Sequence, residues 1–402
     1  MRILSLLCFI LIISACSSKT DEQTRWETHK ANVTIIRDDF GVPHIYGKTD
    51  ADAVFGLLYA QCEDDFNRVE RNYLWATGRL AEAEGKSQLY SDLRANLFMT
   101  QDEAEYYYKT SPEWLQKLCV AFADGINYYL ATHPDVTPKR LTHFEPWMPF
   151  YFFEGSIGGD IESISTQGIQ KVYDAASLIT FTDPDPAMLA EPQGSNGFAI
   201  AGKLTESGKA MLLINPHTSF FFRGEVHVVS EEGLNVYGAV TWGQFFVYQG
   251  FNEHNGWMHT SSYTDVMDEF VETIVEKDGQ LFYQYGDALR PVIQKFITLN
   301  YAEGDSLKEK TFTFYRTHHG PVTHLTNGKW TATAMNWNPA KALEQSFLRT
   351  KTTSHEAFLT VMDLRTNSSN NTVYADADGN IALYQGNFIP KRDVQFDYSK
   401  PV

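Results

Sequence analysis

The chain has 402 residues, 43% of them hydrophobic and 14% aromatic, so it is long enough for a large core or more than one domain. The aromatic content also argues against a disordered chain. The formal net charge of -17 argues against a nucleic-acid partner, because phosphate binding needs a basic face. Composition and charge exclude these classes but do not select a function.

The first residues have the pattern of a secretory leader. Arg2 is followed by an apolar run from Ile3 to Ala15. This run is too short to span a bilayer as a helix and is typical of a signal peptide. We therefore expect residues 1–15 to be removed from the mature protein.

The leader ends in Ile-Ser-Ala-Cys, which resembles a bacterial lipoprotein box with Cys16 as the lipidated first residue. Ser17 rather than Asp follows, which suits sorting to the outer membrane. We expect residues 16–25 to form a lipidated tether in the bacterial cell envelope, with the protein facing the periplasm and touching the membrane only through its lipid. A plain secretory peptide that happens to contain Cys16 is the alternative.

Residues 26–181 are predicted to be mostly helical after a short strand. The strand is the β-branched run Val33 to Ile36, and an extended segment continues from Asp38 to Gly47. A long helix is expected from about Asp52 to Trp75.

A second helix is predicted to start at Ser111-Pro112-Glu113, with Ser111 as its cap and Pro112 in its first turn, and to end before Pro134. Apolar residues recur along it with a helical period. This face consists of Leu115, Leu118, Phe122, Ile126 and Tyr129.

Residues 182–194 read as an exposed, proline-rich spacer, which is typical of a protease-sensitive loop and also of a linker. From Ser195 to the end at 402, the apolar period shifts from the helical value to two. Short strands are expected at 198–201, 210–215, 225–230, 235–240, 245–250 and 311–316. One helix is expected from Ser354 to Asp363, capped by Ser354. Helices followed by strands indicate a layered α+β protein.

Two cysteines remain if Cys8 is removed with the leader and Cys16 is acylated. Cys62 and Cys119 could pair in an oxidising compartment or could be buried thiols, and the sequence leaves both open. Neither a CxxC nor an HExxH pattern is present, so no zinc site is indicated.

The usual hydrolase signatures, GxSxG, the Walker loop and GxGxxG, are missing. Ser195 offers another route to an activated hydroxyl, because it follows Gly194 at the end of the spacer. If that peptide bond is cut, the new α-amine, with an ordinary pKa of about 8, lies beside its own Oγ and can act as general base. By itself, a Gly-Ser pair after a loop is more often an ordinary turn.

Several motifs along the chain change that weighting. They are RDDFGVPHIYG at 37–47, GRLAE at 78–82, GSNGFAI at 194–200, NPH at 215–217, GFNEHNGWMHT at 250–260, RTHHGPV at 316–322 and YADADGNI at 374–381. Together they resemble the penicillin acylase family of N-terminal-nucleophile hydrolases, and the resemblance covers essentially all of residues 30 to 395. The Asn-Pro-His and Trp-x-His-Thr motifs are similar to those of its acyl-homoserine lactone acylase branch.

The resemblance implies roles for individual residues. Self-cleavage would occur between Gly194 and Ser195, which leaves Ser195 as nucleophile and its amine as base. His217 would steady both groups. The backbone N–H of Ser261 would supply one oxyanion donor, an interaction of roughly 3 kcal/mol in the transition state.

The same resemblance places His259, Thr218 and Phe246 around the bound acyl group. Thr218 departs from relatives that carry a bulky aromatic there. The neighbouring aromatic residues are Phe220, Phe221, Phe222, Phe245 and Phe246. Asp265 and Asp268 fall where some family members bind a structural calcium ion, although two carboxylates at this spacing are also common on ordinary surfaces. No cofactor is implied for catalysis.

The implied fold is an αββα sandwich, with two antiparallel sheets between helical layers, built from one precursor that is cut into two subunits. The family's second oxyanion donor, an Asn, lies beyond the segment that residues 387–402 match, so we expect the chain to be truncated and the sandwich incomplete at the C-terminus. The implied reaction is hydrolysis of an N-acyl amide through an acyl-enzyme. N-acyl homoserine lactones and acylated β-lactams are the candidate substrates. A non-catalytic envelope lipoprotein that keeps the fold as a binding module is the rival interpretation.

Overall fold

The computed structural model describes residues 20–151, 161–174, 194–218, 222–262, 264–335, 337–366, 370–385 and 389–402. The predicted leader, Cys16 and all of the predicted spacer except its last residue lie outside these ranges. The described part mixes helices and strands, which confirms a mixed α and β class. Within these ranges, no helix is both long enough and apolar enough to cross a bilayer.

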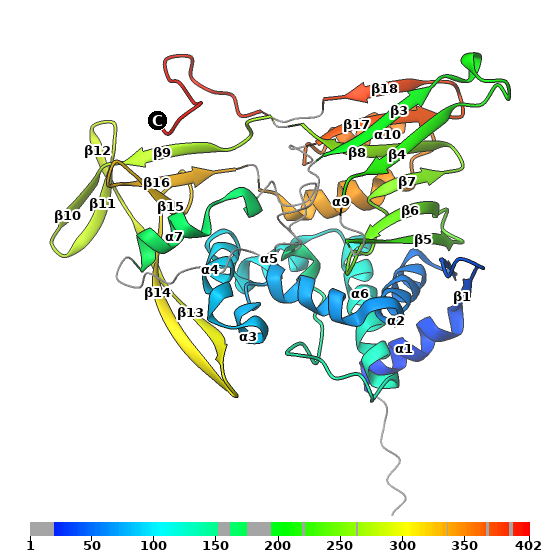
Figure 1. The fold of residues 1–402 in the computed structure, drawn as a ribbon, viewed down its shortest axis with the longest axis horizontal. Coiled ribbons are helices and arrows are strands. Elements are labelled where there is room, and N and C mark those ends of the chain that lie inside the picture. The colour runs from blue at the N-terminus through cyan, green and yellow to red at the C-terminus, as the bar shows by residue number, and fades with distance from the viewer. Residues whose placement is uncertain are drawn as a thin grey trace, which may run out of the picture.

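Most helices belong to the first part of the chain. They are α1 (Asp21–Asn32), α2 (Asp50–Ala76), α3 (Ala81–Glu84), α4 (Leu89–Phe98), α5 (Gln101–Thr110), α6 (Glu113–Thr132), α7 (Thr166–Tyr173), α9 (Pro339–Arg349) and α10 (His355–Met362). Short 3₁₀ turns lie at Lys86–Gln88, Met148–Tyr151, Ile161–Ser163 and Gly202–Leu204. Helices α2 and α6 pack together beneath the main sheet (Figure 1).

The two long predicted helices are confirmed as α2 and α6. Helix α2 begins where Thr49 and Asp52 form a reciprocal capping box, which satisfies backbone N–H groups that the first turn leaves without helical partners. The whole predicted apolar face of α6 is buried. The predicted Ser111 cap is wrong, because the Ser111 hydroxyl donates to the Tyr107 carbonyl at the end of α5 and Pro112 occupies the cap position.

The expected tether also needs correction, because α1 begins at Asp21, inside the 16–25 segment. Thr20 and Gln23 form a capping box that starts this helix. Helix α1 has no fully buried residue, and it is held by the packing of Trp26 against the core and by polar contacts. Arg25 binds the buried carboxylate of Asp124 through two hydrogen bonds of 2.7 and 2.8 Å.

The strands are β1 (Val33–Arg37), β2 (Pro43–Gly47), β3 (Ser195–Ile200), β4 (Met211–Pro216), β5 (Arg223–Ser230), β6 (Asn235–Thr241), β7 (Gln249–Asn252), β8 (Asn255–Ser261), β9 (Asp268–Glu272), β10 (Ile274–Lys277), β11 (Gln280–Tyr285), β12 (Ala288–Pro291), β13 (Ile293–Glu303), β14 (Ser306–Arg316), β15 (Val322–Thr326), β16 (Lys329–Ala334), β17 (Asn370–Asp376) and β18 (Ile381–Tyr384). Eight of them form the main sheet in the order β1-β2-β5-β6-β7-β8-β17-β18. Neighbours in this sheet are antiparallel except β2 and β5. This parallel pair joins the first part of the chain to the part that follows Ser195.

The β3–β4 hairpin covers one face of the main sheet over β8 and β17 (Figure 1). Gly197 is the point of closest approach, because a Cβ there would lie 2.3 Å from the sulfur of Met258 on β8. Helices cover the opposite face. Phe358 of α10 packs on Tyr374 of β17 with ring centroids 4.7 Å apart.

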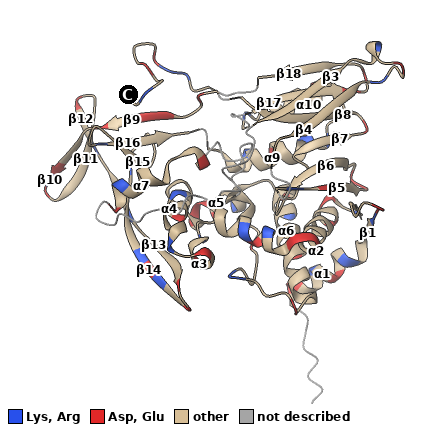
Figure 2. Cartoon of the chain, in the orientation of Figure 1, with Lys and Arg blue, Asp and Glu red and all other residues tan. Residues whose placement is uncertain are grey.

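The remaining strands form a separate region at the left of Figure 1. It contains the β15-β16-β9 sheet, the β10-β11-β12 sheet and the long β13–β14 hairpin, with α7 against β15 and α3 and α4 against β13. Acidic and basic residues are interspersed along this hairpin and along α1 and α2 (Figure 2). The terminal Val402 pairs with β9, since its N–H donates to the Glu269 carbonyl at 2.9 Å.

The strand predictions are confirmed in part. Strands β3 to β6 and the end of β14 lie close to the predicted ranges, and α10 begins after its predicted Ser354 cap. Most of 245–250 is a turn that precedes β7 rather than a strand. Helix α9, strands β8 to β13 and strands β15 to β18 were not predicted.

Candidate active site

Ser195 is the first residue of β3 and is half-buried. It pairs with Pro216 at the end of β4, so the two termini of the hairpin meet at this residue. In the uncut chain, the Ser195 hydroxyl donates a hydrogen bond of 2.7 Å to the carbonyl oxygen of Gly194. The candidate nucleophile therefore lies against the peptide bond that self-processing would cut.

Gly194 has a backbone φ of +113°, a conformation that residues with a side chain rarely adopt. A Cβ at this position would meet no atom within 4 Å. The requirement for glycine therefore comes from the backbone conformation and not from crowding.

His217 follows β4 and approaches the nucleophile with its backbone. Its N–H lies 3.3 Å from the Gly194 carbonyl oxygen and 3.4 Å from Ser195 Oγ. Its imidazole is directed toward Asn196, the residue after Ser195, with Nε2 3.2 Å from the side-chain amide nitrogen. The structure thus brings the main chain of His217, and not its imidazole, to Ser195.

Thr260 of β8 makes two hydrogen bonds with Ser195 that the sequence analysis missed. Its hydroxyl donates to the Ser195 carbonyl oxygen at 2.6 Å and accepts from the Ser195 N–H at 3.2 Å. Ser261, the predicted oxyanion donor, is the next residue and ends β8 in an exposed position. The signal for Thr260 was its place in the Trp-x-His-Thr motif, one residue before the predicted donor.

His259 lies on the other side of the same strand, because consecutive side chains of a strand point to opposite faces. It is 2% exposed, its Nδ1 lies 2.9 Å from Thr372 Oγ1, and its ring packs on Tyr248 at 4.9 Å. Burial lowers the pKa of His259 well below its ordinary value, and the charges of Arg349 and Arg223 act in the same direction. The structure therefore places His259 behind the sheet rather than beside Ser195.

Of the other predicted pocket residues, Phe246 lies in the core and Thr218 lies next to His217. Phe246 is 2% exposed and packs edge-on against Phe245, whose ring lies 6.4 Å from that of Phe347 on α9. Thr218 is half-buried directly after His217. Phe222 is half-buried, and Phe220 and Phe221 lie outside the described residues.

Asp265 and Asp268, the two predicted calcium ligands, form ion pairs with an arginine instead. Arg392 lies 3.0 Å from a carboxylate oxygen of Asp265 and 2.7 Å from one of Asp268, and the bond to Asp268 is the main cause that raises its pKa. Calcium needs six to eight oxygen ligands. No group of three or more His, Cys, Asp or Glu residues that could hold a metal occurs in the described part of the chain. As arranged here, the two carboxylates do not fit a calcium site.

Cys62 and Cys119 are both buried and unpaired. Burial raises the pKa of both thiols above the ordinary value. They are therefore core thiols rather than a disulfide or a reactive pair.

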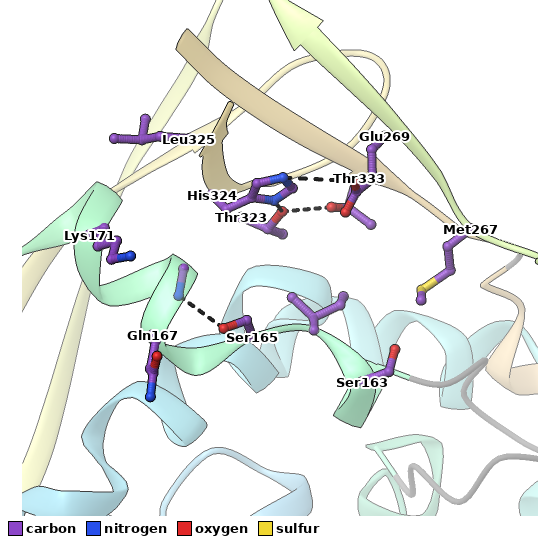
Figure 3. Close-up of a pocket in the computed structure, with 12 residues that line it drawn as sticks. Ser163, Ser165, Gln167, Lys171, Met267, Glu269, Thr323, His324, Leu325 and Thr333 are labelled. Atoms are coloured by element: carbon purple, nitrogen blue, oxygen red, sulfur yellow. Dashed lines mark hydrogen bonds and ion pairs between the residues drawn. The ribbon is translucent and has the colours of Figure 1, made fainter. Parts of the chain in front are cut away.

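A cavity of about 400 Å³ lies between α7 and the β15-β16-β9 sheet, away from Ser195, and is lined by Lys171, Glu269 and His324 among others (Figure 3). There, the hydroxyls of Thr323 and Thr333 lie 2.6 Å apart (Figure 3). Another cavity, of about 680 Å³, includes Asp268 as the one predicted site residue in its lining.

Comparison with known proteins assigns the chain to a family. Residues 32–402 match the family model described as penicillin amidase, so the chain belongs to this family.

Among curated relatives, the chain is similar to the acyl-homoserine lactone acylase QuiP of Pseudomonas fluorescens strain Pf-5, with 24% identity over 343 residues that cover 74% of this chain and 42% of the relative. It is also similar to the acyl-homoserine lactone acylase PvdQ of Pseudomonas fluorescens strain Pf0-1, with 23% identity over 336 residues, 76% of this chain and 42% of the relative. The chain therefore spans about two fifths of the length of these relatives.

Among solved structures, the chain is similar to a thermostable penicillin G acylase from Alcaligenes faecalis. The identity is 23% and the TM-score is 0.44, with 52% of this chain and 38% of that chain covered.

Proposed function

We propose that this chain carries the nucleophile of a self-processing N-acyl amide hydrolase. The observation that carries the proposal is the convergence of two donors, the Ser195 hydroxyl at 2.7 Å and the His217 N–H at 3.3 Å, on the carbonyl oxygen of Gly194. Membership of the penicillin amidase family supports the same reaction class.

The arrangement suits an N-to-O acyl shift. Ser195 Oγ attacks the Gly194 carbonyl carbon, and negative charge develops on the oxygen that the His217 N–H faces. The C–N bond to Ser195 then breaks, and the nitrogen takes the hydroxyl proton to become an amine. Water hydrolyses the resulting ester, which leaves a carboxylate on Gly194 and restores the Ser195 hydroxyl.

The same atoms then serve turnover. The free amine of Ser195 accepts the proton of its own Oγ, directly or through one water, as Oγ attacks the amide carbonyl of a substrate. The amine half of the substrate leaves with a proton, and water releases the acid from the acyl-enzyme. Ser261 would contribute its backbone N–H to the oxyanion, and removal of one such donor costs about 10²–10³-fold in rate.

The layers observed around Ser195 support the αββα sandwich as the fold of this enzyme, with the β3–β4 hairpin beginning the second sheet. Cleavage at Gly194 would produce two subunits, and the parallel pairing of β2 with β5 would hold them together. We infer that the functional form is this two-chain assembly.

For the substrate we propose an N-acyl homoserine lactone, because the named relatives are acyl-homoserine lactone acylases. The family description supports an acylated β-lactam as the second candidate. Release of free amine from each compound, followed as kcat/KM, separates them, and preference for the β-lactam would reverse the assignment.

The decisive experiment is intact-mass analysis of the wild-type protein and the Ser195→Ala variant. We expect wild-type protein to yield a chain that begins at Ser195 and the variant to remain uncut and inactive. An active wild-type protein whose second chain begins elsewhere would contradict the proposal. Absence of both cleavage and turnover in the wild-type protein would instead favour the non-catalytic binding module.

We further propose that the mature protein is an envelope lipoprotein anchored through Cys16, on the sequence pattern alone. The Cys16→Ala variant should move from the membrane fraction to the soluble periplasm and keep its activity, because the anchor is remote from Ser195 in sequence. Unchanged fractionation would contradict the anchor.

A further inference from the structure

We propose that Thr260 is a positioning residue for the N-terminal nucleophile: its hydroxyl holds the nitrogen of Ser195 before cleavage and the α-amine after it. The inference rests on the proposed self-processing function. It assigns a role to a side chain that the motif comparison left without one.

The hydrogen-bond geometry defines what the hydroxyl can do. A threonine hydroxyl has one proton to donate and lone pairs to accept with. The short bond of 2.6 Å commits the Thr260 proton to the Ser195 carbonyl oxygen. The oxygen can therefore act only as an acceptor toward the Ser195 nitrogen, which lies 3.2 Å away.

This polarity matters once the Gly194–Ser195 bond is cut. The new neutral amine has two N–H bonds and one lone pair, and it works as a base only if the lone pair points at its own Oγ or at a water that bridges to Oγ. An acceptor at the position of Thr260 Oγ1 takes one of the N–H bonds and so limits rotation about the Cα–N bond. Orientation of this kind is a recognised contribution to rate, and misplacement of a reacting group by about 1 Å costs roughly 10²-fold.

The protein fixes Thr260 relative to Ser195 by two means. Strand β8 is held between β7 and β17, with Thr260 opposite Asn371 in the antiparallel register. The hairpin that carries Ser195 is docked on β8 close to both residues. Met258, two residues before Thr260, packs against the bare backbone of Gly197, two residues after Ser195. The acceptor is thus placed by the packing of the hairpin on the sheet rather than by a mobile side chain.

The test compares Thr260→Val, which keeps the shape and removes the hydroxyl, with Thr260→Ser, which restores it. Thr333→Val is the control, because Thr333 is also a strand threonine whose hydroxyl is hydrogen-bonded, in its case to Thr323, but it lies far along the chain from the site. For each protein, the fraction cleaved at Ser195 is measured by mass, and kcat and KM are measured on the cleaved fraction.

We expect Thr260→Val to slow cleavage and to lower kcat by about 10- to 100-fold with little change in KM, because the amine is misdirected while the substrate site is intact. Thr260→Ser should recover most of both rates, and Thr333→Val should match wild type. Wild-type rates in Thr260→Val, or a failure of Thr260→Ser to recover them, would overturn the inference.

A second measurement does not depend on activity. In the uncut Ser195→Ala protein, the amide N–H of residue 195 still faces Thr260. Addition of Thr260→Val should speed hydrogen exchange at that amide about three- to tenfold, as expected for the loss of one hydrogen bond. Unchanged exchange would overturn the contact itself, whereas an uncleaved and inactive wild-type protein with the expected exchange would overturn only the proposed function.

Discussion

The two faces of strand β8 contact different parts of the molecule. The face toward the helices carries Trp257 and His259, which are 0% and 2% exposed. The face toward the β3–β4 hairpin carries Met258, which is also fully buried, and the half-buried Thr260, which bonds to Ser195. Adjacent residues of one motif therefore serve different ends. The sealed face stabilises the fold, and the hairpin face presents polar groups to the candidate nucleophile.

Among variants that test the difference between the two faces, Trp257→Ala is expected to have the largest effect, a loss of stability. The buried indole packs in the core and donates to the Tyr248 carbonyl at 2.9 Å, so its removal should lower the free energy of unfolding by about 3–5 kcal/mol. Denaturant unfolding measures this loss. Protein that still folds should cleave at Ser195 at the normal rate, and selective loss of cleavage without loss of stability would break the distinction between the faces.

The pH dependence of stability tests the sealed face at His259. The pKa of His259 is lower in the folded protein than in the unfolded chain, so the unfolded chain binds a proton that the folded protein does not bind. The contribution of this group to stability therefore falls as the pH drops below about 6.5, by about 1.4 kcal/mol per pH unit until the folded pKa is reached.

The variant His259→Asn should flatten this slope of unfolding free energy between about pH 6.5 and 5, because it removes the titrating group. Unfolding curves at several pH values measure the difference. An unchanged slope would show that His259 is not held neutral in the folded protein.

On the hairpin face, Gly194→Ala should slow cleavage about tenfold. The positive φ of Gly194 costs a residue with a side chain roughly 1–2 kcal/mol, and relaxation of that strain would move the scissile carbonyl away from Ser195 Oγ. Gly208→Ala is the control, since Gly208 also has a positive φ and open space but lies in the loop at the other end of the hairpin. Equal effects of the two variants on cleavage would refute this reason.

The smallest effect is expected from Asn196→Ala, which removes the bond between Asn196 and the His217 imidazole. This contact is exposed, and the His217 N–H is bonded to the Gly194 carbonyl oxygen independently of it, so cleavage should change by less than about threefold. A time course of cleavage by mass checks it. A decrease in cleavage rate as large as that expected for Gly194→Ala would show that the imidazole of His217 takes part in cleavage.

The sequence by itself determined much that depends on local chemistry. Periodicity predicted α2, α6 and the strands β3 to β6, because side-chain spacing reflects which face is buried. The order of motifs indicated the family and placed Ser195, Gly194 and His217 together, and the structure brings these three into contact. Such features are readable because they are consecutive or occur in a fixed order along the chain.

Only the tertiary structure decided which atoms of those residues meet. It turned His217 so that its main chain faces Ser195, engaged Asp265 and Asp268 with the distant Arg392, and buried His259 behind the sheet while Thr260 reached the nucleophile. Two consecutive residues of a strand are adjacent in the sequence, but their side chains point to opposite faces of the sheet. Which of those faces receives the β3–β4 hairpin is fixed by packing between residues about sixty positions apart, and no local pattern encodes it.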